Sequence, residues 1–192
     1  MKFPHSFLLE RVAVVTLLIA AQFIPVHAEV VESGANGFAL QRTVHIAANP
    51  ERVFTALIQP AKWWDSEHTF SGNAANLSID TKAGGCFCET WNGGSVQHLV
   101  VVNTAPGKTL RLRGALGPFQ GQGVDGALTF TLKASGDGTD LTMENVVGGY
   151  MKGGFAKWPP LADSMLAGQM VRLKRYIETG SPENPSKTGG SP

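Results

Sequence analysis

The stretch AGGCFCETWNGGSVQH, residues 83–98, holds the residue types of this sequence that are best suited to chemistry. Two cysteines stand one residue apart, and a glutamate, a tryptophan and a histidine follow them. Two thiols can join in a disulfide or, together with the histidine, ligate a metal ion. A carboxylate beside an imidazole can transfer protons or hold the polar end of a ligand. The local fold of the stretch decides which of these chemistries is geometrically open.

We predict that this stretch folds as a β-hairpin with glycines 93–94 as its two-residue turn. In that register Glu89 lies opposite His98, and Phe87 and Trp91 flank the pair on the same face. On a concave surface, the two residues would form a general acid/base pair or a polar anchor for a ligand. On an outer surface they would be an exposed cross-strand ion pair worth about 0.2–1 kcal/mol. The sequence leaves both interpretations open.

The same alternation places Cys86 and Cys88 on the face opposite His98, so we predict no metal site. In an extended strand, Cα atoms two residues apart are separated by roughly 6.5–7 Å, which is the upper limit for a disulfide. We therefore predict free thiols. The alternatives are a disulfide, which would need a bent or bulged backbone, and a shared metal.

The first elements of the fold can be located from periodicity and capping residues. Residues 38–48 alternate apolar and polar side chains, which predicts a half-buried strand. Asn49 followed by Pro50 is typical of a helix start, and Pro60 ends that helix. A second short helix or loop is expected to open at residues 63–64.

Beyond this point the sequence predicts mainly strands. Turn-forming sequences separate six of them, at 76–80, 86–91, 95–104, 108–114, 124–135 and 139–149. A long helix follows, because apolar residues recur at helical spacing from Ala162 to Ile177 and Gly180 provides a stop. Gly168 lies inside this helix, and we expect a close contact there to require it.

This order of elements predicts the fold class. We expect an α+β helix-grip fold, in which a curved antiparallel sheet of six to seven strands wraps around the long C-terminal helix. A short helix pair follows the first strand. Because a curved sheet and a straight helix do not match in curvature, we expect a cavity between them.

The two ends of the chain have different compositions from the domain. Residues 1–28 are predicted to be a signal peptide cleaved after Ala28, since about thirteen apolar residues are too few to span a bilayer. An uncleaved anchor is the alternative. Residues 29–37 are expected to be a flexible leader, 38–178 the domain, and 179–192 a disordered tail. The predicted location is the periplasm or another exported compartment.

The distribution of charged residues limits the classes of binding partner that we expect. The predicted mature chain has equal numbers of basic and acidic residues and no basic cluster. Nucleic acids and anionic membrane surfaces are recognised through clustered Lys and Arg, so we expect neither as a partner. No later apolar run is long enough to cross a membrane.

Several segments resemble the START-like (SRPBCC, Bet v 1-type) superfamily, in the branch related to the activator of the heat-shock-protein-90 ATPase. The similar segments are IAANPERVFTALIQPAKWW, AGGCFCETW, VVVNTAPGKTLRLRG and PLADSMLAGQMVRLKRYIETG. The resemblance spans roughly residues 38–178 and implies the fold more strongly than an activity. Two departures matter: the predicted export would separate the chain from a cytosolic chaperone, and CFCE replaces the Arg-aromatic-Arg of many relatives.

Three functions are compatible with these observations. The leading hypothesis is an exported protein that binds a small, largely apolar or amphipathic molecule in the cavity, without a cofactor. A cyclase- or hydrolase-like enzyme that uses Glu89 and His98 as an acid/base pair is the second, and an envelope protein-interaction module is the third. The residues predicted to line the cavity are Phe87, Glu89, Trp91, His98, Phe130, Met143, Leu166 and Met170.

Overall fold

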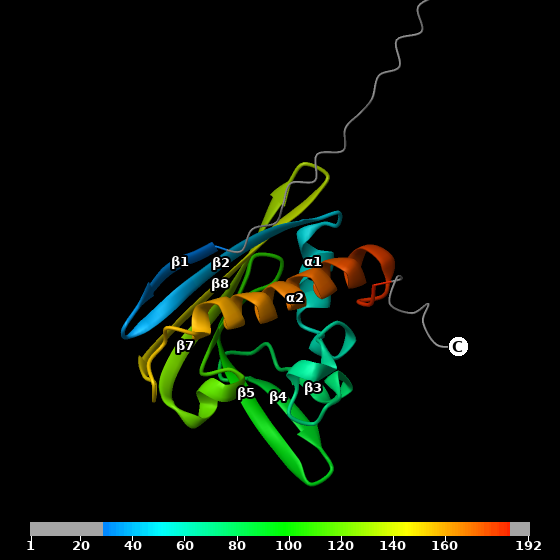
Figure 1. The fold of residues 1–192 in the computed structure, drawn as a ribbon. Helices are drawn as coiled ribbons and strands as arrows, with labels where there is room; N and C mark the ends of the chain where they lie inside the picture. The colour runs from blue at the N-terminus through cyan, green and yellow to red at the C-terminus, as the bar shows by residue number, and fades with distance from the viewer. Residues whose placement is uncertain (1–28, 185–192) are drawn as a thin grey trace, which may run out of the picture.

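The computed structural model describes residues 29–184 (Figure 1). The predicted signal peptide lies outside the described residues, as does most of the predicted tail. Within residues 29–184, no helix combines the length and the apolar character that a membrane crossing requires.

One antiparallel sheet of eight strands forms the body of the domain, in the spatial order β1-β2-β8-β7-β6-β5-β4-β3. The strands are β1 (Glu29–Gly34), β2 (Gly37–Ile46), β3 (Leu77–Ile79), β4 (Cys86–Trp91), β5 (Gly94–Ala105), β6 (Thr109–Arg113), β7 (Gly123–Ser135) and β8 (Gly138–Tyr150). In Figure 1 the sheet curves around the C-terminal helix, which crosses its concave face. The predicted α+β helix-grip fold is confirmed.

The sheet has more strands than predicted because the expected leader forms strand β1. Residues 29–34 pair with β2 across a short turn, with Val30 opposite Leu40 and Gly34 opposite Gly37. The pairing shifts register between Val30 and Glu32. This irregularity breaks the alternation of side chains that identifies a strand in a sequence.

The long helix α2 (Trp158–Thr179) buries one apolar face against the sheet. Its buried apolar positions, Ala162, Leu166, Met170, Leu173 and Ile177, follow the predicted helical spacing. Gly180 ends the helix with a φ of 82°, and its N–H donates to the carbonyl of Tyr176. Gly168 differs from expectation, because it is exposed and a Cβ there would meet nothing within 4 Å.

The predicted helix pair consists of α1 (Pro50–Leu57) and short 3₁₀ turns. The side chain of Asn49 caps α1 by accepting from the N–H of Arg52. The turns η1 (Pro60–Lys62), η2 (Ser66–His68) and η3 (Ala74–Asn76) follow it, and η4 (Gly117–Gly121) lies between β6 and β7.

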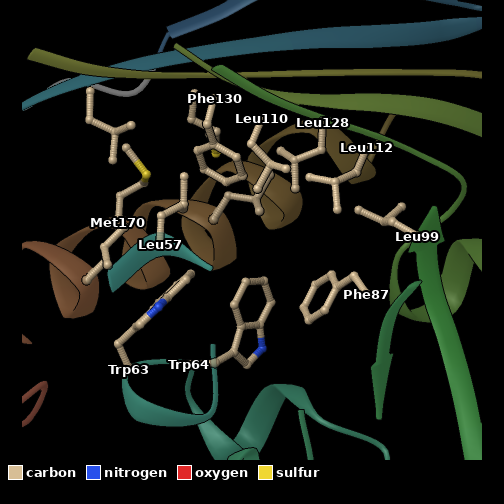
Figure 2. Packing of buried hydrophobic residues seen from close by; sticks show 14 of the residues in the cluster. Leu57, Trp63, Trp64, Phe87, Leu99, Leu110, Leu112, Leu128, Phe130 and Met170 are labelled. Carbon is tan, nitrogen blue, oxygen red and sulfur yellow. The ribbon is translucent and has the colours of Figure 1, made fainter. Parts of the chain in front are cut away.

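The middle of the space between sheet and helices is filled by side chains. Phe130, Met143 and Met170 are all buried in one apolar cluster with leucines of β6 and β7. Figure 2 shows Trp63 and Trp64 extending into this cluster from the segment after α1, with Phe87 beside Trp64. Two open spaces lie beside the first half of α2, and a third lies between α1 and the C-terminal end of α2.

Candidate functional site

The β4–β5 hairpin has a different turn from the one predicted. Trp91 pairs with Gly94, so the turn residues are Asn92 and Gly93. Gly93 has a φ of 94°, which glycine adopts without steric cost. Gly94 must accommodate the Trp91 ring, because a Cβ at Gly94 would lie 2.5 Å from it. Near the turn, the observed register therefore differs from the predicted one by two residues. Because side chains alternate with a period of two, each residue still points to the predicted face of the sheet.

Strand β5 contains a β-bulge at His98. Phe87 pairs with Leu99 whereas Cys88 pairs with Gln97, so His98 is the extra residue in β5. Both His98 and Leu99 are buried, although neighbouring residues of a regular strand face opposite sides. The bulge therefore lets two consecutive residues, His98 and Leu99, lie on the concave face.

Cys86 and Cys88 form a disulfide, so the prediction of free thiols is wrong. Their Cα atoms are 5.3 Å apart, which is shorter than the roughly 6.6 Å of two extended residues. The contraction coincides with the register shift between Phe87 and Cys88. A backbone shorter than fully extended was the condition for a disulfide, and the 5.3 Å separation of the Cα atoms meets it.

Glu89 is completely buried and accepts hydrogen bonds from three groups. The N–H groups of Phe70 and Ser71 donate to its carboxylate, and His98 Nε2 lies 3.1 Å from Oε2. Burial alone would raise the pKa of Glu89, but hydrogen bonds from Ser71, Phe70 and His98 outweigh it and lower the pKa. Glu89 is therefore an anion at neutral pH that ties the segment after η2 to the sheet.

This anion fixes the state of His98. An ionised carboxylate only accepts hydrogen bonds, so Nε2 of His98 carries the proton and donates it to Glu89. Burial lowers the pKa of His98, although Glu89 opposes the effect, so the ring is neutral at pH 7. Nδ1 is then an acceptor. The ring contacts Phe87 and Phe70, with centroids 5.1 and 5.8 Å away.

His98 lines an open groove with a volume of about 900 Å³, which we call the outer groove. Residues 64–70 form one wall, Phe87 and His98 the floor, and residues 116–121 the other wall. Hydrogen bonds anchor the first wall near both of its ends. The N–H of Asp65 donates to Gln169 of α2, and the N–H of Phe70 donates to Glu89 of β4.

A smaller inner pocket of about 310 Å³ adjoins the outer groove and lies under the first half of α2. The two spaces share His68, Met165 and residues 116–118 as lining. Leu99, Leu128, Trp158 and Leu166 supply much of the remaining surface of the inner pocket.

The structure brings only some of the predicted site residues together. Phe87 and His98 line the outer groove, Leu166 lines the inner pocket, and Glu89 lies behind His98. Trp91 is half-buried at the hairpin end and lines neither space. The other predicted wall residues, Phe130, Met143 and Met170, belong to the filled interior and line neither space.

The side chains of the groove walls could not be assigned to a face of the fold from the sequence. Trp64, Phe70, Leu116 and Pro118 lie in segments without periodicity, so no pattern assigns their side chains to a face. Asn145 of the inner pocket could have been found from the sequence. It is a polar residue at a position of β8 where the alternation of the strand predicts a core residue.

Comparison with known proteins gives the family. The model for "Activator of Hsp90 ATPase homolog 1-like protein" matches residues 47–167. No curated protein matches the chain significantly.

Solved structures share the fold at low identity. EF2215 from Enterococcus faecalis is 16% identical over 82% of this chain and 81% of its own, with a TM-score of 0.57. CalU16 from Micromonospora echinospora is 16% identical over 84% and 85%, with a TM-score of 0.52. DynU16 is 20% identical over 75% of this chain and 48% of its own, with a TM-score of 0.55. These likenesses show the fold, and the family model, which matches more than half of the chain, shows that the chain belongs to the activator of Hsp90 ATPase homolog 1-like family of START-like (SRPBCC) proteins.

Proposed function

We propose that the protein binds a small, largely apolar or amphipathic molecule in the outer groove and inner pocket, with His98 as a polar anchor. The observation that carries this proposal is the state of His98. One ring nitrogen is committed to the buried Glu89 carboxylate, and the other is left as a hydrogen-bond acceptor in a residue that lines the groove. A neutral, oriented acceptor among aromatic rings suits a ligand hydroxyl or N–H group.

The size and lining of the two spaces support the same proposal. Both volumes fall in the range of about 300–1,000 Å³ that is usual for small-molecule sites. Trp64, Phe70 and Phe87 provide aromatic surface near His98. DynU16, which shares the fold, is described as a protein of the dynemicin biosynthetic locus. That likeness is an analogy at the level of fold, because one scaffold serves many functions.

A pair of matched tryptophan substitutions tests the proposal. Leu116→Trp adds a large ring to the groove wall, whereas Val146→Trp adds the same ring at an exposed position of β8. Titration with N-phenyl-1-naphthylamine, followed by its fluorescence, should show saturable binding to the wild type. We expect at least a tenfold loss of affinity in Leu116→Trp and none in Val146→Trp. Absence of saturable binding, or equal binding by both variants, would contradict the proposal.

A second candidate function is proton transfer by His98. Its hydrogen bond to Glu89 fixes the orientation of the ring, as a histidine that acts as a general base requires. The two residues would not share the roles of acid and base. Glu89 is fully buried behind His98, so it would position the ring, and His98 alone would meet a substrate. Turnover of 4-nitrophenyl esters that is lost in His98→Phe, with the fold intact by circular dichroism, would favour this function over simple binding.

We also propose that the protein is exported. The signal-like residues 1–28 suggest it, and the Cys86–Cys88 disulfide supports it, because disulfides persist mainly in oxidising compartments. N-terminal sequencing of the protein from the envelope fraction should give Glu29 as the first residue. Recovery of the full-length chain from the cytoplasm would contradict export.

A further inference from the structure

Asn145 is a polar residue in the apolar interior of the inner pocket. It lies on β8 between Leu40 of β2 and Leu128 of β7, and its neighbours on the same face are Met143 and Val147. Only 7% of its surface is exposed. The side chain therefore faces the space under α2 rather than bulk solvent.

The amide of Asn145 makes no hydrogen bond within the described part of the chain, although its side chain lines the pocket. A side-chain amide has two N–H donors and an oxygen that accepts two hydrogen bonds. Buried polar groups are nearly always paired, so an unpaired amide at a pocket wall indicates a partner from outside the chain.

The rest of the inner pocket limits the charge of that group. Its lining contains leucines, Phe119, Val147 and Trp158, and none of the lining residues is an acid, a lysine or an arginine. Apart from Asn145, the polar groups are the His68 ring and the indole N–H of Trp158. His68 also lines the outer groove, so it lies toward the entrance. A carboxylate or ammonium group pushed against Asn145 would lose its hydration without gaining an opposite charge.

We infer that the inner pocket selects a molecule whose buried end carries one uncharged carbonyl or hydroxyl group, recognised by Asn145. This inference rests on the proposed binding function and assigns the chemistry of the ligand's inner end. Asn145 can donate to a carbonyl oxygen or accept from a hydroxyl, so both groups satisfy the same amide. The apolar lining takes the attached hydrocarbon, and the polar part of the ligand that meets His98 remains in the outer groove.

Four probes of similar size separate the possibilities: naphthalene, 2-naphthol, 2-acetylnaphthalene and 2-naphthoate. For the wild type we expect 2-naphthol and 2-acetylnaphthalene to bind about 3- to 10-fold more tightly than naphthalene, which matches one net hydrogen bond. We expect 2-naphthoate to bind more weakly than naphthalene. Calorimetry or competition with N-phenyl-1-naphthylamine measures these ratios.

Substitution of the amide identifies the group responsible. Asn145→Leu should remove the preference for the oxygenated probes and retain or improve naphthalene binding. Asn103→Leu makes the same change at an exposed position of β5 and should leave the preference intact. If Asn145→Leu does not fold, the ranking of the probes by the wild type still tests the inference, as does a ligand-induced shift of the Asn145 side-chain N–H resonances.

The outcomes distinguish this inference from the proposed function. Equal binding of all neutral probes, or a preference that persists in Asn145→Leu, overturns the role of Asn145 and leaves the proposed function standing. Tight binding of 2-naphthoate overturns the neutral-group specificity. Failure of every probe to bind overturns both the inference and the function on which it rests.

Discussion

Glu89 on β4 and His98 on β5 are joined by a hydrogen bond of 3.1 Å between Oε2 and Nε2, with His98 on the floor of the outer groove and Glu89 buried behind it. The carboxylate simultaneously accepts from the backbone of Phe70 and Ser71. One buried anion thus holds a strand, a bulged histidine and a groove wall together.

Loss of the Glu89 charge should destabilise the fold. In Glu89→Gln, an amide N–H replaces one acceptor oxygen and faces donors that have no alternative partner. Because hydrogen bonds to charged groups contribute about 1.5–3 kcal/mol, we expect the free energy of unfolding in urea to fall by about 2–3 kcal/mol. Glu144→Gln, at an exposed position of β8, should change it by less than about 0.5 kcal/mol. Equal stability of the two variants would show that the Glu89 network is not formed.

Acid should destabilise the protein in two steps. The pKa of His98 is lowered below 6.5 in the folded state, so the unfolded chain binds that proton first and stability falls as the pH drops below 6.5. The pKa of Glu89 is lowered below 4.5, so its stabilisation is present above pH 4.5 and is lost as the pH falls further, through the folded pKa. Urea unfolding measured from pH 8 to pH 3 reports both steps.

Variants assign the two steps. His98→Phe should abolish the step below pH 6.5. The pKa of exposed His45 is raised, chiefly by its hydrogen bond to Asp140, so this residue contributes stability below pH 6.5 that is lost as the pH rises. His45→Gln should therefore remove a loss of stability that occurs above pH 6.5 and leave the step below pH 6.5 in place. Disappearance of the lower step in His45→Gln would contradict its assignment to His98.

Reduction of the Cys86–Cys88 disulfide should weaken the protein modestly and the site more strongly. The bond closes a very short loop, for which the chain-entropy relation gives about 1–2 kcal/mol of stabilisation. It also restrains β4 beside the bulge that positions His98, so probe affinity should fall on treatment with a phosphine reductant. The double variant Cys86→Ala, Cys88→Ala should already show the lower affinity and should not respond to reductant. Mass spectrometry verifies that the disulfide is fully reduced. If the affinity of the reduced wild type were unchanged, the disulfide would not restrain the site.

Gly168→Ala should stabilise the protein by about 1 kcal/mol, because glycine is a poor helix residue and the new methyl group enters open space. Gly85→Ala is the contrasting change, since its Cβ would lie 2.1 Å from the carbonyl oxygen of Asp80. Thermal unfolding should show a higher midpoint for the first variant and a lower one for the second. A lower midpoint for Gly168→Ala would indicate a helix contact that the geometry does not contain.

Much of the fold follows from local rules that act within the chain. Strand β4 has the predicted bounds, Cys86–Trp91, and α1 begins at Pro50 after its Asn49 cap as expected. The Glu89–His98 pair was also predictable, because a register error of two residues preserves which side chains share a face.

The features that escaped prediction depend on backbone irregularity or tertiary contact. The bulge at His98 and the shift between Val30 and Glu32 each interrupt a period of two, and no sequence pattern specifies them. Phe130 and Met143 alternate correctly toward the concave face, but only the packing of Trp63 and its neighbours decides that this part of the interior is filled.

The hydrogen bonds of Glu89 constrain one wall of the outer groove and leave the other wall free to vary in sequence. The segment at Phe70 and Ser71 cannot change course without unpairing a buried charge. The facing segment presents Leu116 and Pro118, whose apolar side chains can be exchanged without that penalty. Engineering of new ligand preferences should therefore begin at residues 116–121, with the anchor and its supporting segment left as they are.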